Sequence, residues 1–429
     1  MAKKKFALVG ASARAREMYG MPMVEDYSDV CELVGVFDIN YGRACVVAED
    51  CGGAPVFTDF DEMIAKAKPD CIIISTVDKF HAEYIIRGIK AGVQVYTEKP
   101  MCINAQQCRE ILETERQYGV HIGCTFNDRY TSYFLRLKQL VPELVGKVFT
   151  MNFEWMLARP KVSGNHGASY YRRWNAYMDL SGGLALTKAT HHFDDANWII
   201  GEHPKRVSAF GKLRVYGKNG PYRARCCREC SHTKECEFYT RISPDKQRMY
   251  VDNEKYDGYL IDRCAFDEKI DIYDSMAVSV EYDGGAVMNY TETSTCAYEG
   301  FKMFINGEKG RMEINFFSNG RGGLRINEGF DFIRYIDLRG NIVTYSLPLA
   351  KNGGSHDGSD QSLRDVLFRG CTPEDPSQKA SALDAAYSVL IGSAVNLSIK
   401  EGRIVDIDEL IGDPTLLERD PNFDYTTVY

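Results

Sequence analysis

Residues 181–198, SGGLALTKATHHFDDANW, bring a lysine, two histidines and two aspartates together within eight positions. Amines, imidazoles and carboxylates are the side chains that proteins use to move protons at neutral pH. The remaining positions are apolar in a pattern typical of a buried helix. Because helix positions three or four apart share a face, Thr187, Lys188 and His191 can cluster, and Lys188 also reaches His192. The stretch is therefore either a catalytic cluster or the solvated face of a helix.

The first third of the chain has the pattern of elements that position such groups. Short apolar runs alternate with helix-compatible segments such as YGRACVVAEDCG and HAEYIIRGIKAG. The alternation predicts βαβ units, which form a doubly wound parallel sheet with helices on both faces. In such a sheet, ligands bind beyond the carboxyl ends of the strands. The apolar runs are KKFALV, ELVGVFD, APVFTD, DCIIIST and VQVYTEKP.

The residues after the first two apolar runs suit a dinucleotide. Gly10-Ala-Ser12 keeps only the first glycine of the GxGxxG fingerprint, but Ser12 is small and the next helix offers amide donors to a pyrophosphate. On its own this turn fits an ordinary structural loop equally well. Asp38 closes the second run, where a carboxylate accepts the ribose hydroxyls of NAD and repels a 2′-phosphate. Arg14 and Arg43 keep NADP as an alternative.

Composition limits the partners of the protein. A chain of 429 residues with 44% apolar side chains is long enough for two domains. The net charge of −8 argues against a nucleic-acid or anionic-membrane partner, because phosphate binding needs a basic surface. The early run FALVGA is too short for a signal peptide, and no other stretch approaches the roughly 18 apolar residues of a membrane span. We expect a soluble, cytoplasmic protein that binds neither nucleic acid nor membrane.

Residues 75–102, STVDKFHAEYIIRGIKAGVQVYTEKPMC, resemble the glucose-fructose oxidoreductase, inositol dehydrogenase and MocA family (Gfo/Idh/MocA). The resemblance lies in Ser75-Thr76 at a strand end, in His81 opening a helix and above all in Glu98-Lys99-Pro100 after the fifth strand. Later segments, among them GKVFTMNFEW, FKMFINGEKGRMEI and SALDAAYSVLIGSAVNLSIKEGRIVDI, are similar to the family's second domain.

The resemblance implies two domains and a cofactor. A Rossmann domain is expected over residues 1–128, and an α+β domain with a large open, mostly antiparallel sheet over residues 129–429. Lys99 would hydrogen-bond a substrate hydroxyl beside the nicotinamide and stabilise an alkoxide; the alternative is a surface lysine paired with Glu98. The expected cofactor contacts are Gly10, Ser12, Ala13, Arg14, Asp38, Asn40, Arg43, Ser75, Thr76, His81, Glu98, Lys99, Pro100 and Asn127.

The same resemblance assigns roles in the polar helix. Aligned on its glycines, His191 takes the place of the family's catalytic histidine and Thr187 that of its aspartate. Threonine does not take a proton at neutral pH, so we expect His191 to be the general base, oriented by Asp194 or Asp195. Lys188 would keep a neighbouring histidine neutral, while His192 is either catalytic or a core or solvent-facing residue. The candidate catalytic residues are Lys99, Lys188, His191 and His192.

Two further segments are candidates for substrate binding. NHGASYYRRWNAYMDLSGG is rich in rings and guanidinium groups, which suit sugar faces and hydroxyl edges, although its side chains cannot all point inward. The glycine-rich KNGGSHDGSDQSL is a loop by composition and is similar to the family's substrate loop. The expected substrate contacts are Lys99, Tyr171, Arg172, Arg173, Trp174, Thr187, His191, His356 and Asp360.

A cysteine-rich insertion spans about residues 211–270. With no export segment the fourteen cysteines should stay reduced, so clustered ones suggest metal binding. Four thiolates predict a structural zinc site; an iron-sulfur cluster uses the same ligands, and a loose group of thiols is the remaining alternative. The expected ligands are Cys227, Cys230, Cys236 and Cys264, with Cys226 and His232 as substitutes.

Three functions follow from these observations. The leading one is NAD-dependent oxidation or reduction of a secondary hydroxyl of a sugar, glycoside or cyclic polyol. The second is redox-neutral glycoside cleavage through transient oxidation and elimination, and the third is a non-enzymatic NAD(H) sensor. Because an open sheet has a wide face to cover, a homodimer or homotetramer is expected.

Overall fold

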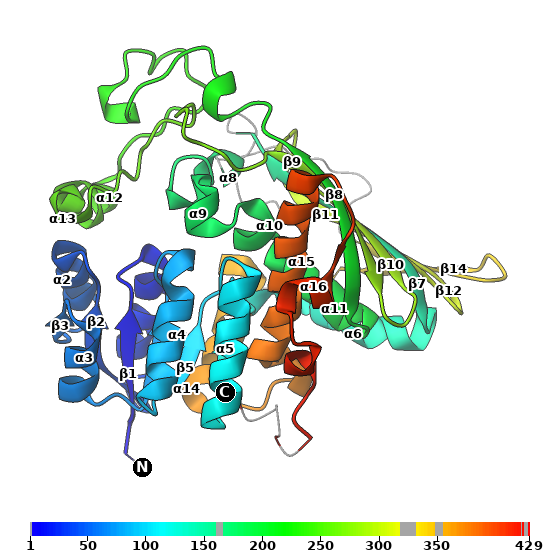
Figure 1. Cartoon of the computed structure of the whole chain (residues 1–429), viewed down its shortest axis with the longest axis horizontal. Helices are drawn as coiled ribbons and strands as arrows, with labels where there is room; N and C mark the ends of the chain where they lie inside the picture. Colours follow the sequence, from blue (N-terminus) through cyan, green and yellow to red (C-terminus); the bar gives the residue numbers. More distant parts are fainter. Residues whose placement is uncertain (1, 160–165, 318–331, 348–354, 422, 424–427) are drawn as a thin grey trace.

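A computed structural model describes residues 2–159, 166–317, 332–347, 355–421, 423 and 428–429. Figure 1 shows a sheet with helices around it, joined to a second, larger sheet that is covered by helices on one side. A loop-rich segment extends from the second sheet above the first domain. The site described below lies between these parts.

The first sheet has the strand order β15-β6-β5-β4-β1-β2-β3 within the described residues. Alternate residues of β1 belong to two different hydrophobic cores, Phe6 and Leu8 to one, Ala7 and Val9 to the other. Both faces are therefore covered, which confirms the predicted doubly wound parallel sheet. Its strands are β1 Lys4–Val9, β2 Cys31–Phe37, β3 Val56–Phe57, β4 Cys71–Ile74, β5 Gln94–Thr97, β6 Gly123–Cys124 and the antiparallel edge strand β15 Ala380–Ser381. Its helices are α1 Met21–Glu25, α2 Tyr41–Asp50, α3 Phe60–Ala67, α4 His81–Lys90 and α5 Ala105–Tyr118.

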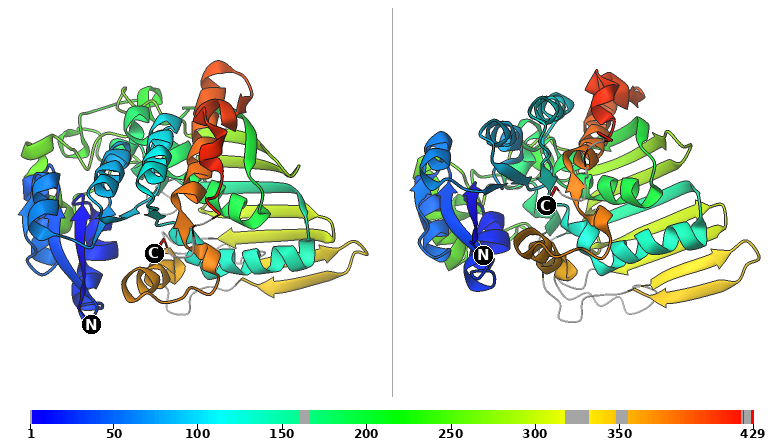
Figure 2. Two further views of the ribbon diagram at one scale, coloured as in Figure 1. Left: turned by 60° about the horizontal axis from the view of Figure 1, so that its bottom comes forward. Right: turned by 90° about the horizontal axis from the view of Figure 1, so that it is seen from below.

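The second sheet has the order β14-β13-β12-β11-β7-β10-β9-β8-β16 within the described residues. Only β7 and β10 pair in parallel there, which confirms a mostly antiparallel sheet. Helices α6 Ser132–Leu140, α11 Ala189–Ile200 and α15 Ala382–Glu401 cover one face (Figure 2). The strands are β7 Val148–Ala158, β8 Pro204–Lys212, β9 Ser275–Tyr282, β10 Val287–Cys296, β11 Gly300–Gly307, β12 Gly310–Phe317, β13 Phe332–Asp337, β14 Ile342–Ser346 and β16 Val405–Asp406.

Helix α15 corrects one expectation. It is the one described helix that is long and apolar enough to cross a membrane by length and composition, although no stretch of that kind was expected from the sequence. In the structure, 72% of its most apolar window is buried inside the protein. The buried helix of a globular core meets the same compositional test, so composition alone is weak evidence for a membrane span.

The sequence predicts a domain boundary at residue 128, and some residues beyond it also pack on the first domain. Helix α14, Ser359–Arg369, packs on the first domain, and its Phe368 ring lies 5.2 Å from that of Phe6 and 5.1 Å from that of Tyr27. Strand β15 also joins the first sheet. The first domain is therefore completed by residues from the second half of the chain.

The insertion lies between β8 and β9, at residues 213–274. It contains two short helices, α12 Pro244–Met249 and α13 Glu254–Asp257, which Figure 1 shows above α2. This segment, which the sequence predicts to be an insertion, reaches back to the nucleotide domain.

Candidate active site

A cavity of about 1140 Å³ lies between the two domains. Its wall includes Gly10, Asp38, Ser75 and Glu98, which follow β1, β2, β4 and β5, the edge where ligands of such sheets bind. Residues of the second domain form the opposite wall. Typical small-molecule pockets have volumes of roughly 300–1000 Å³, so this one has room for a dinucleotide together with a sugar.

The loop after β1 allows the close approach that a pyrophosphate needs. Gly10 has φ +104°, and a Cβ at this position would lie 2.6 Å from the carbonyl oxygen of Ser75, so only glycine fits. Ser12 Oγ is 2.9 Å from Ser75 Oγ and accepts a hydrogen bond from the backbone N–H of Ala15. The missing glycines of the fingerprint are therefore replaced by a loop that serine hydroxyls hold in place.

Asp38 stands at the end of β2 as expected for a ribose-binding carboxylate. It lines the cavity and accepts hydrogen bonds from the backbone N–H groups of Ala11 and Asn40. The Asn40 side chain instead caps α2 through the N–H of Arg43, and it faces away from the cavity. The other expected cofactor contacts line the cavity except Pro100, which a cis peptide bond joins to Lys99.

Lys99 lines the cavity and faces the polar helix. Its Nζ donates to the carbonyl oxygen of Thr187 at 2.9 Å, across the two domains. Burial and the neighbouring Lys188 ammonium lower the pKa of Lys99 to about 8. Glu98 pairs with Arg14 at 2.7 Å. The alternative of a surface lysine paired with Glu98 is therefore wrong.

His191 is buried in the cavity wall with 5% of its surface exposed. Its Nδ1 lies 3.6 Å from Oδ2 of Asp128, in the 3₁₀ turn Asn127–Tyr130 that leaves the nucleotide domain. Burial, followed by the charges of Lys99 and Lys188, holds the pKa of His191 well below its ordinary value. The imidazole is neutral at physiological pH and able to take a proton.

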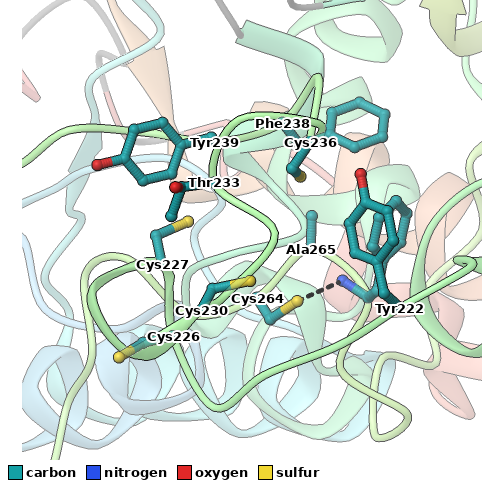
Figure 3. A pocket seen from close by; sticks show the side chains of 11 residues that line it. Tyr222, Cys226, Cys227, Cys230, Thr233, Cys236, Phe238, Tyr239, Cys264 and Ala265 are labelled. Atoms are coloured by element: carbon teal, nitrogen blue, oxygen red, sulfur yellow. Dashed lines mark hydrogen bonds between the residues drawn. The ribbon is translucent and has the colours of Figure 1, made fainter.

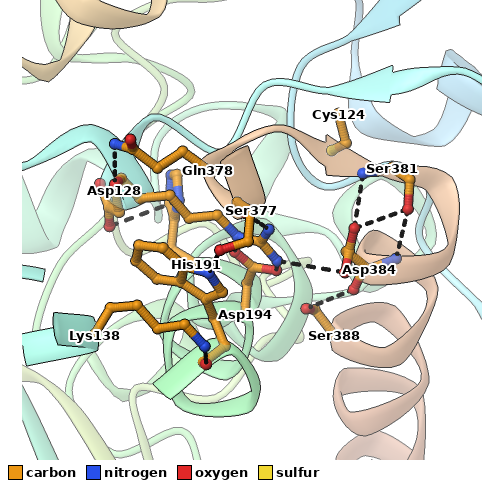
Figure 4. Close-up of polar contacts among 12 residues, drawn as sticks. Cys124, Asp128, Lys138, His191, Asp194, Ser377, Gln378, Ser381, Asp384 and Ser388 are labelled. Atoms are coloured by element: carbon orange, nitrogen blue, oxygen red, sulfur yellow. Dashed lines mark hydrogen bonds and ion pairs between the residues drawn. The ribbon is translucent and has the colours of Figure 1, made fainter. Parts of the chain in front are cut away.

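The carboxylate beside His191 is not one that the sequence indicated. Asp194 is held by Arg129, with Nε to Oδ2 at 2.6 Å, and both oxygens of Asp195 are buried without a hydrogen-bond partner in the described structure. The expected orientation of His191 by Asp194 or Asp195 is therefore wrong. Figure 4 shows Asp128 beside His191, whereas Asp194 accepts two hydrogen bonds from Arg129.

We expect Arg129→Met to lower the free energy of unfolding by about 3 kcal/mol, because breaking a buried ion pair leaves an uncompensated charge. The side chains of Arg129 and Asp194 are only 4% and 1% exposed. Urea unfolding measures the change, with Arg116→Met, at a half-exposed arginine, as the control. Adding Asp194→Leu should recover most of the loss. An unfolding free energy of Arg129→Met equal to that of the control would contradict the expectation.

Of the other two candidates on the polar helix, Lys188 lines the cavity and His192 does not. Lys188 Nζ lies 4.5 Å from the centroid of the Trp155 ring, and nearby Tyr170 and carboxylates raise its pKa against the effect of burial. His192 is fully buried, stacks on Trp155 at 4.0 Å and lies 2.6 Å from the hydroxyl of Tyr290. The structure thus places His192 in the core.

Asp78 lines the cavity beside Lys99 and was not singled out in the sequence. Burial raises the pKa of its carboxyl well above the ordinary value, although the charge of Lys99 opposes the shift. A protonated carboxylic acid at this place can donate a proton. Asp78 is the first residue of the 3₁₀ turn Asp78–Phe80, and no motif in the sequence marked it.

The aromatic and arginine-rich segment divides between cavity and core. Arg173 and Trp174 line the cavity, together with Tyr170, which was not predicted. Tyr171 is buried, stacking on Tyr216 at 3.8 Å, while the buried Arg172 faces the cysteine-rich insertion, and neither lines the cavity.

Only some of the remaining expected substrate contacts lie in the cavity wall. Thr187 and His356 line the cavity, whereas Asp360 lies behind it. Asp360 accepts hydrogen bonds from Arg14 and Asn127 and lies 2.9 Å from Nδ1 of His356. It therefore connects the nucleotide loop with the substrate side of the cavity.

The cysteines of the insertion do not form the predicted zinc site. Among the described residues, no group of three or more His, Cys, Asp or Glu side chains is placed to hold a metal ion. Figure 3 shows the sulfur atoms spread around a small cavity, with that of Cys226 turned away from the others. Backbone N–H groups donate to two of them, Cys230 and Cys264, and Phe238 and Phe266 pack alongside. The thiols pack as small apolar side chains in this structure.

Comparisons with known proteins agree with this geometry. A family model described as an oxidoreductase family with an NAD-binding Rossmann fold matches residues 4–126, and the model of that family's C-terminal alpha/beta domain matches residues 156–407. The chain is 32% identical to a putative oxidoreductase, YteT, of Bacillus subtilis (strain 168), over 95% of this chain and 98% of that protein.

More distant relatives carry names that refer to sugars. D-glucoside 3-dehydrogenase of Escherichia coli (strain K12) is 27% identical over 40% of this chain and 47% of that protein. The crystal structure of the WlbA dehydrogenase from Bordetella pertussis, in complex with NADH and UDP-GlcNAcA, superposes with a TM-score of 0.62 at 18% identity, covering 94% of this chain and 99% of that one.

Proposed function

The chain belongs to the Gfo/Idh/MocA family of oxidoreductases, and we propose that it uses NAD to oxidise or reduce a secondary hydroxyl of a sugar, glycoside or cyclic polyol. Family membership confirms the expected enzyme. The observation that carries the proposal is that Lys99 of the nucleotide domain and His191 of the second domain line one cavity. The names of the distant relatives support the class of substrate.

The residues present fit a nicotinamide dinucleotide. Gly10 and Ser12 leave space for its pyrophosphate beside the following amides, and Asp38 offers a carboxylate to the ribose hydroxyls. When bound, the cofactor supplies the hydride acceptor or donor for the carbon that carries the hydroxyl. The protein's own residues then have to bind the sugar and move a proton.

Lys99 and His191 divide this proton chemistry. The Lys99 ammonium donates a hydrogen bond to the substrate oxygen and stabilises the negative charge that develops on it. The neutral imidazole of His191 takes the hydroxyl proton during oxidation, and the nearby Asp128 carboxylate stabilises the imidazolium that forms. Lys188 adds a second positive charge to the cavity wall, which stabilises a substrate alkoxide and disfavours binding of a cation.

We expect kcat/KM for oxidation to fall as pH rises through about 8, because Lys99 loses its ammonium there. Below that pH the ammonium is present and the rate is full. His191, whose pKa is lowered, stays neutral through mildly acidic pH and limits activity only in more acidic solution. Initial rates of NADH formation across this range measure the profile.

A variant tests whether deprotonation of Lys99 causes the expected fall of kcat/KM above about pH 8, the alkaline limb of the profile. Lys99→Arg should show a lower rate without the limb, since a guanidinium stays protonated in this range. A wild-type rate that increases through pH 8 would mean that the free amine of Lys99 acts as the base, contrary to the proposed role.

Redox-neutral glycoside cleavage is a second candidate, favoured by Asp78. In that reaction a transient keto group on the sugar acidifies a neighbouring C–H bond, and the aglycone leaves by elimination. The Asp78 carboxyl lines the cavity, and burial raises its pKa, which suits it to protonate the leaving oxygen. One panel of free sugars, glycosides and 3-keto sugars with NAD separates the two reactions: net NADH formation supports dehydrogenation, aglycone release without net NADH supports cleavage, and neither signal overturns both.

We also propose that the protein assembles as a homodimer or homotetramer through the open face of the second sheet. Phe210 on β8 and Val287 on β10 are 78% and 37% exposed. Large apolar side chains exposed on a broad sheet are typical of a surface that a partner covers.

A further inference from the structure

The cysteine-rich insertion contributes to the nucleotide site, although it belongs to the second domain in sequence. The Tyr250 hydroxyl oxygen accepts a hydrogen bond from the N–H of Ala13 at 3.1 Å, within the loop that follows β1. Asn40 Nδ2 donates to the carbonyl oxygen of Asn253 at 3.0 Å. A Cβ on Gly42 would collide with the Asn253 side chain. The segment from α12 to α13 therefore packs directly on the start of α2.

Ion pairs hold this segment in place. Arg16 Nη1 lies 2.8 Å from Oδ1 of Asp245, and Arg248 Nη1 lies 2.8 Å from Oδ1 of Asp50. One pair has its arginine in the nucleotide domain and the other has its arginine in the insertion. The charges on the two surfaces are thus complementary in both directions, which fixes the position of the segment.

The segment also places a carboxylate beside the ribose-binding end of the cavity. Arg43 Nη2 lies 3.1 Å from Oδ1 of Asp38 and 2.9 Å from Oδ2 of Asp257, the last residue of α13. The Arg43 side chain is only 13% exposed, and Tyr259 lies alongside its guanidinium at 5.9 Å. Asp257 and Tyr259 line the same cavity as Asp38.

We propose that Asp257 is a specificity-determining residue, which makes the site select NAD over NADP by neutralising Arg43. This inference rests on the proposed function. An arginine near the end of the second strand is the group that accommodates a 2′-phosphate in related nucleotide sites. Here Arg43 is present, but it lies between the carboxylates of Asp38 and Asp257. The three side chains together therefore carry one net negative charge.

A phosphate entering this place meets an unfavourable field. It carries about two negative charges near neutral pH, and it would have to displace Arg43 from Asp257 or lie beside both carboxylates. The ribose hydroxyls of NAD carry no charge and can donate to Asp38. Asp38 already disfavours NADP, and the insertion adds a second carboxylate, that of Asp257, which disfavours it further.

The test is the ratio of dissociation constants for NADP and NAD in the full-length protein, measured by quenching of tryptophan fluorescence. We expect Asp257→Asn to lower this ratio about tenfold, as removal of one like charge from a partly solvated site does, mainly through tighter NADP binding. The matched control is Asp252→Asn, which removes the same charge from the same segment at an exposed residue that bonds Gln247. The control should leave the ratio unchanged.

A double variant tests whether Arg43 is responsible for the tighter NADP binding of Asp257→Asn. Asp257→Asn with Arg43→Gln should lose the gain, because the released guanidinium is what binds the phosphate. A ratio for Asp257→Asn that equals the control, in a protein with unchanged circular dichroism and NAD binding, overturns the inference and leaves the proposed function standing. Failure of the wild-type protein to bind either dinucleotide overturns both.

Discussion

Lys99→Met is expected to lower kcat by about four orders of magnitude, the upper range for loss of a group that both moves protons and stabilises charge. Methionine keeps most of the length of the side chain, so the cavity changes little in shape. What is lost is the ammonium, which carries the charge beside the cavity and spans the two domains to Thr187. Steady-state rates with a substrate from the sugar panel measure the effect.

The control for this variant separates chemistry from cofactor binding. Lys99→Met should still bind NAD, because the loop at Gly10 and the carboxylate of Asp38 are untouched. Lys90→Met, at the exposed end of α4, removes the same charge from the surface and should keep full activity. If Lys99→Met retained more than about a tenth of the wild-type kcat, proton transfer would have to be assigned to another group.

His191→Asn is expected to lower kcat by about three orders of magnitude, since the amide cannot take the hydroxyl proton. Asparagine keeps a polar group of similar size on the side of the cavity that faces Asp128, so the wall of the cavity should persist. KM should change much less than kcat, because the imidazole contributes most when charge develops in the transition state. The comparison is with His203→Asn, at a histidine with 59% of its side chain exposed.

A second readout distinguishes a general base from a residue that only supports the fold. Substrates should bind His191→Asn with nearly unchanged affinity while turnover is lost. If affinity and turnover fell together, with a lower melting temperature, the imidazole would be a packing residue, and Asp78 would become the leading candidate for proton transfer.

The family hallmark and the strand pattern allowed much of the site to be predicted. Each apolar run contains a strand of the first sheet, and residues just beyond strand ends, such as Gly10, Asp38 and Ser75, meet at one edge because parallel strands end there. Glu98 and Lys99 follow the next strand, so the same argument places them. Local pattern was sufficient for these residues because the sheet itself brings them together.

Asp128 shows why the rest was not predictable. Its proximity to His191 is produced by the turn between the domains and by the path of α11, which no local spacing encodes. The sequence predicted one helix carrying Thr187, Lys188 and the two histidines, but in the structure α10 Leu184–Thr187 ends before Lys188 and α11 begins after it, at Ala189. Helix spacing also contains no information on which imidazole stacks on Trp155. The same limit applies to Tyr171 and Arg172, adjacent to cavity residues but turned into the protein.

The predicted metal site at the cysteines was wrong for a different reason. Spacing alone suggested a shared ligand, but the orientation of each sulfur depends on neighbouring side chains, and the rings of Phe238 and Phe266 pack edge to face in the wall of the same small cavity. The ion pair of Arg43 with Asp257 was equally hidden, because it joins residues that are more than two hundred positions apart in the chain. Interactions of this kind require the tertiary fold.

The nucleotide domain also depends on residues that leave the ribosome late. Tyr27 donates to Asp365 across 338 positions, and the Phe368 ring covers Phe6 and Tyr27. A nascent chain that has emerged only as far as β6 must keep that apolar surface uncovered until α14 appears. Such long-range closure slows folding and exposes intermediates to aggregation. The two halves of the protein therefore mature together during synthesis, and their evolution is constrained as one cooperative unit.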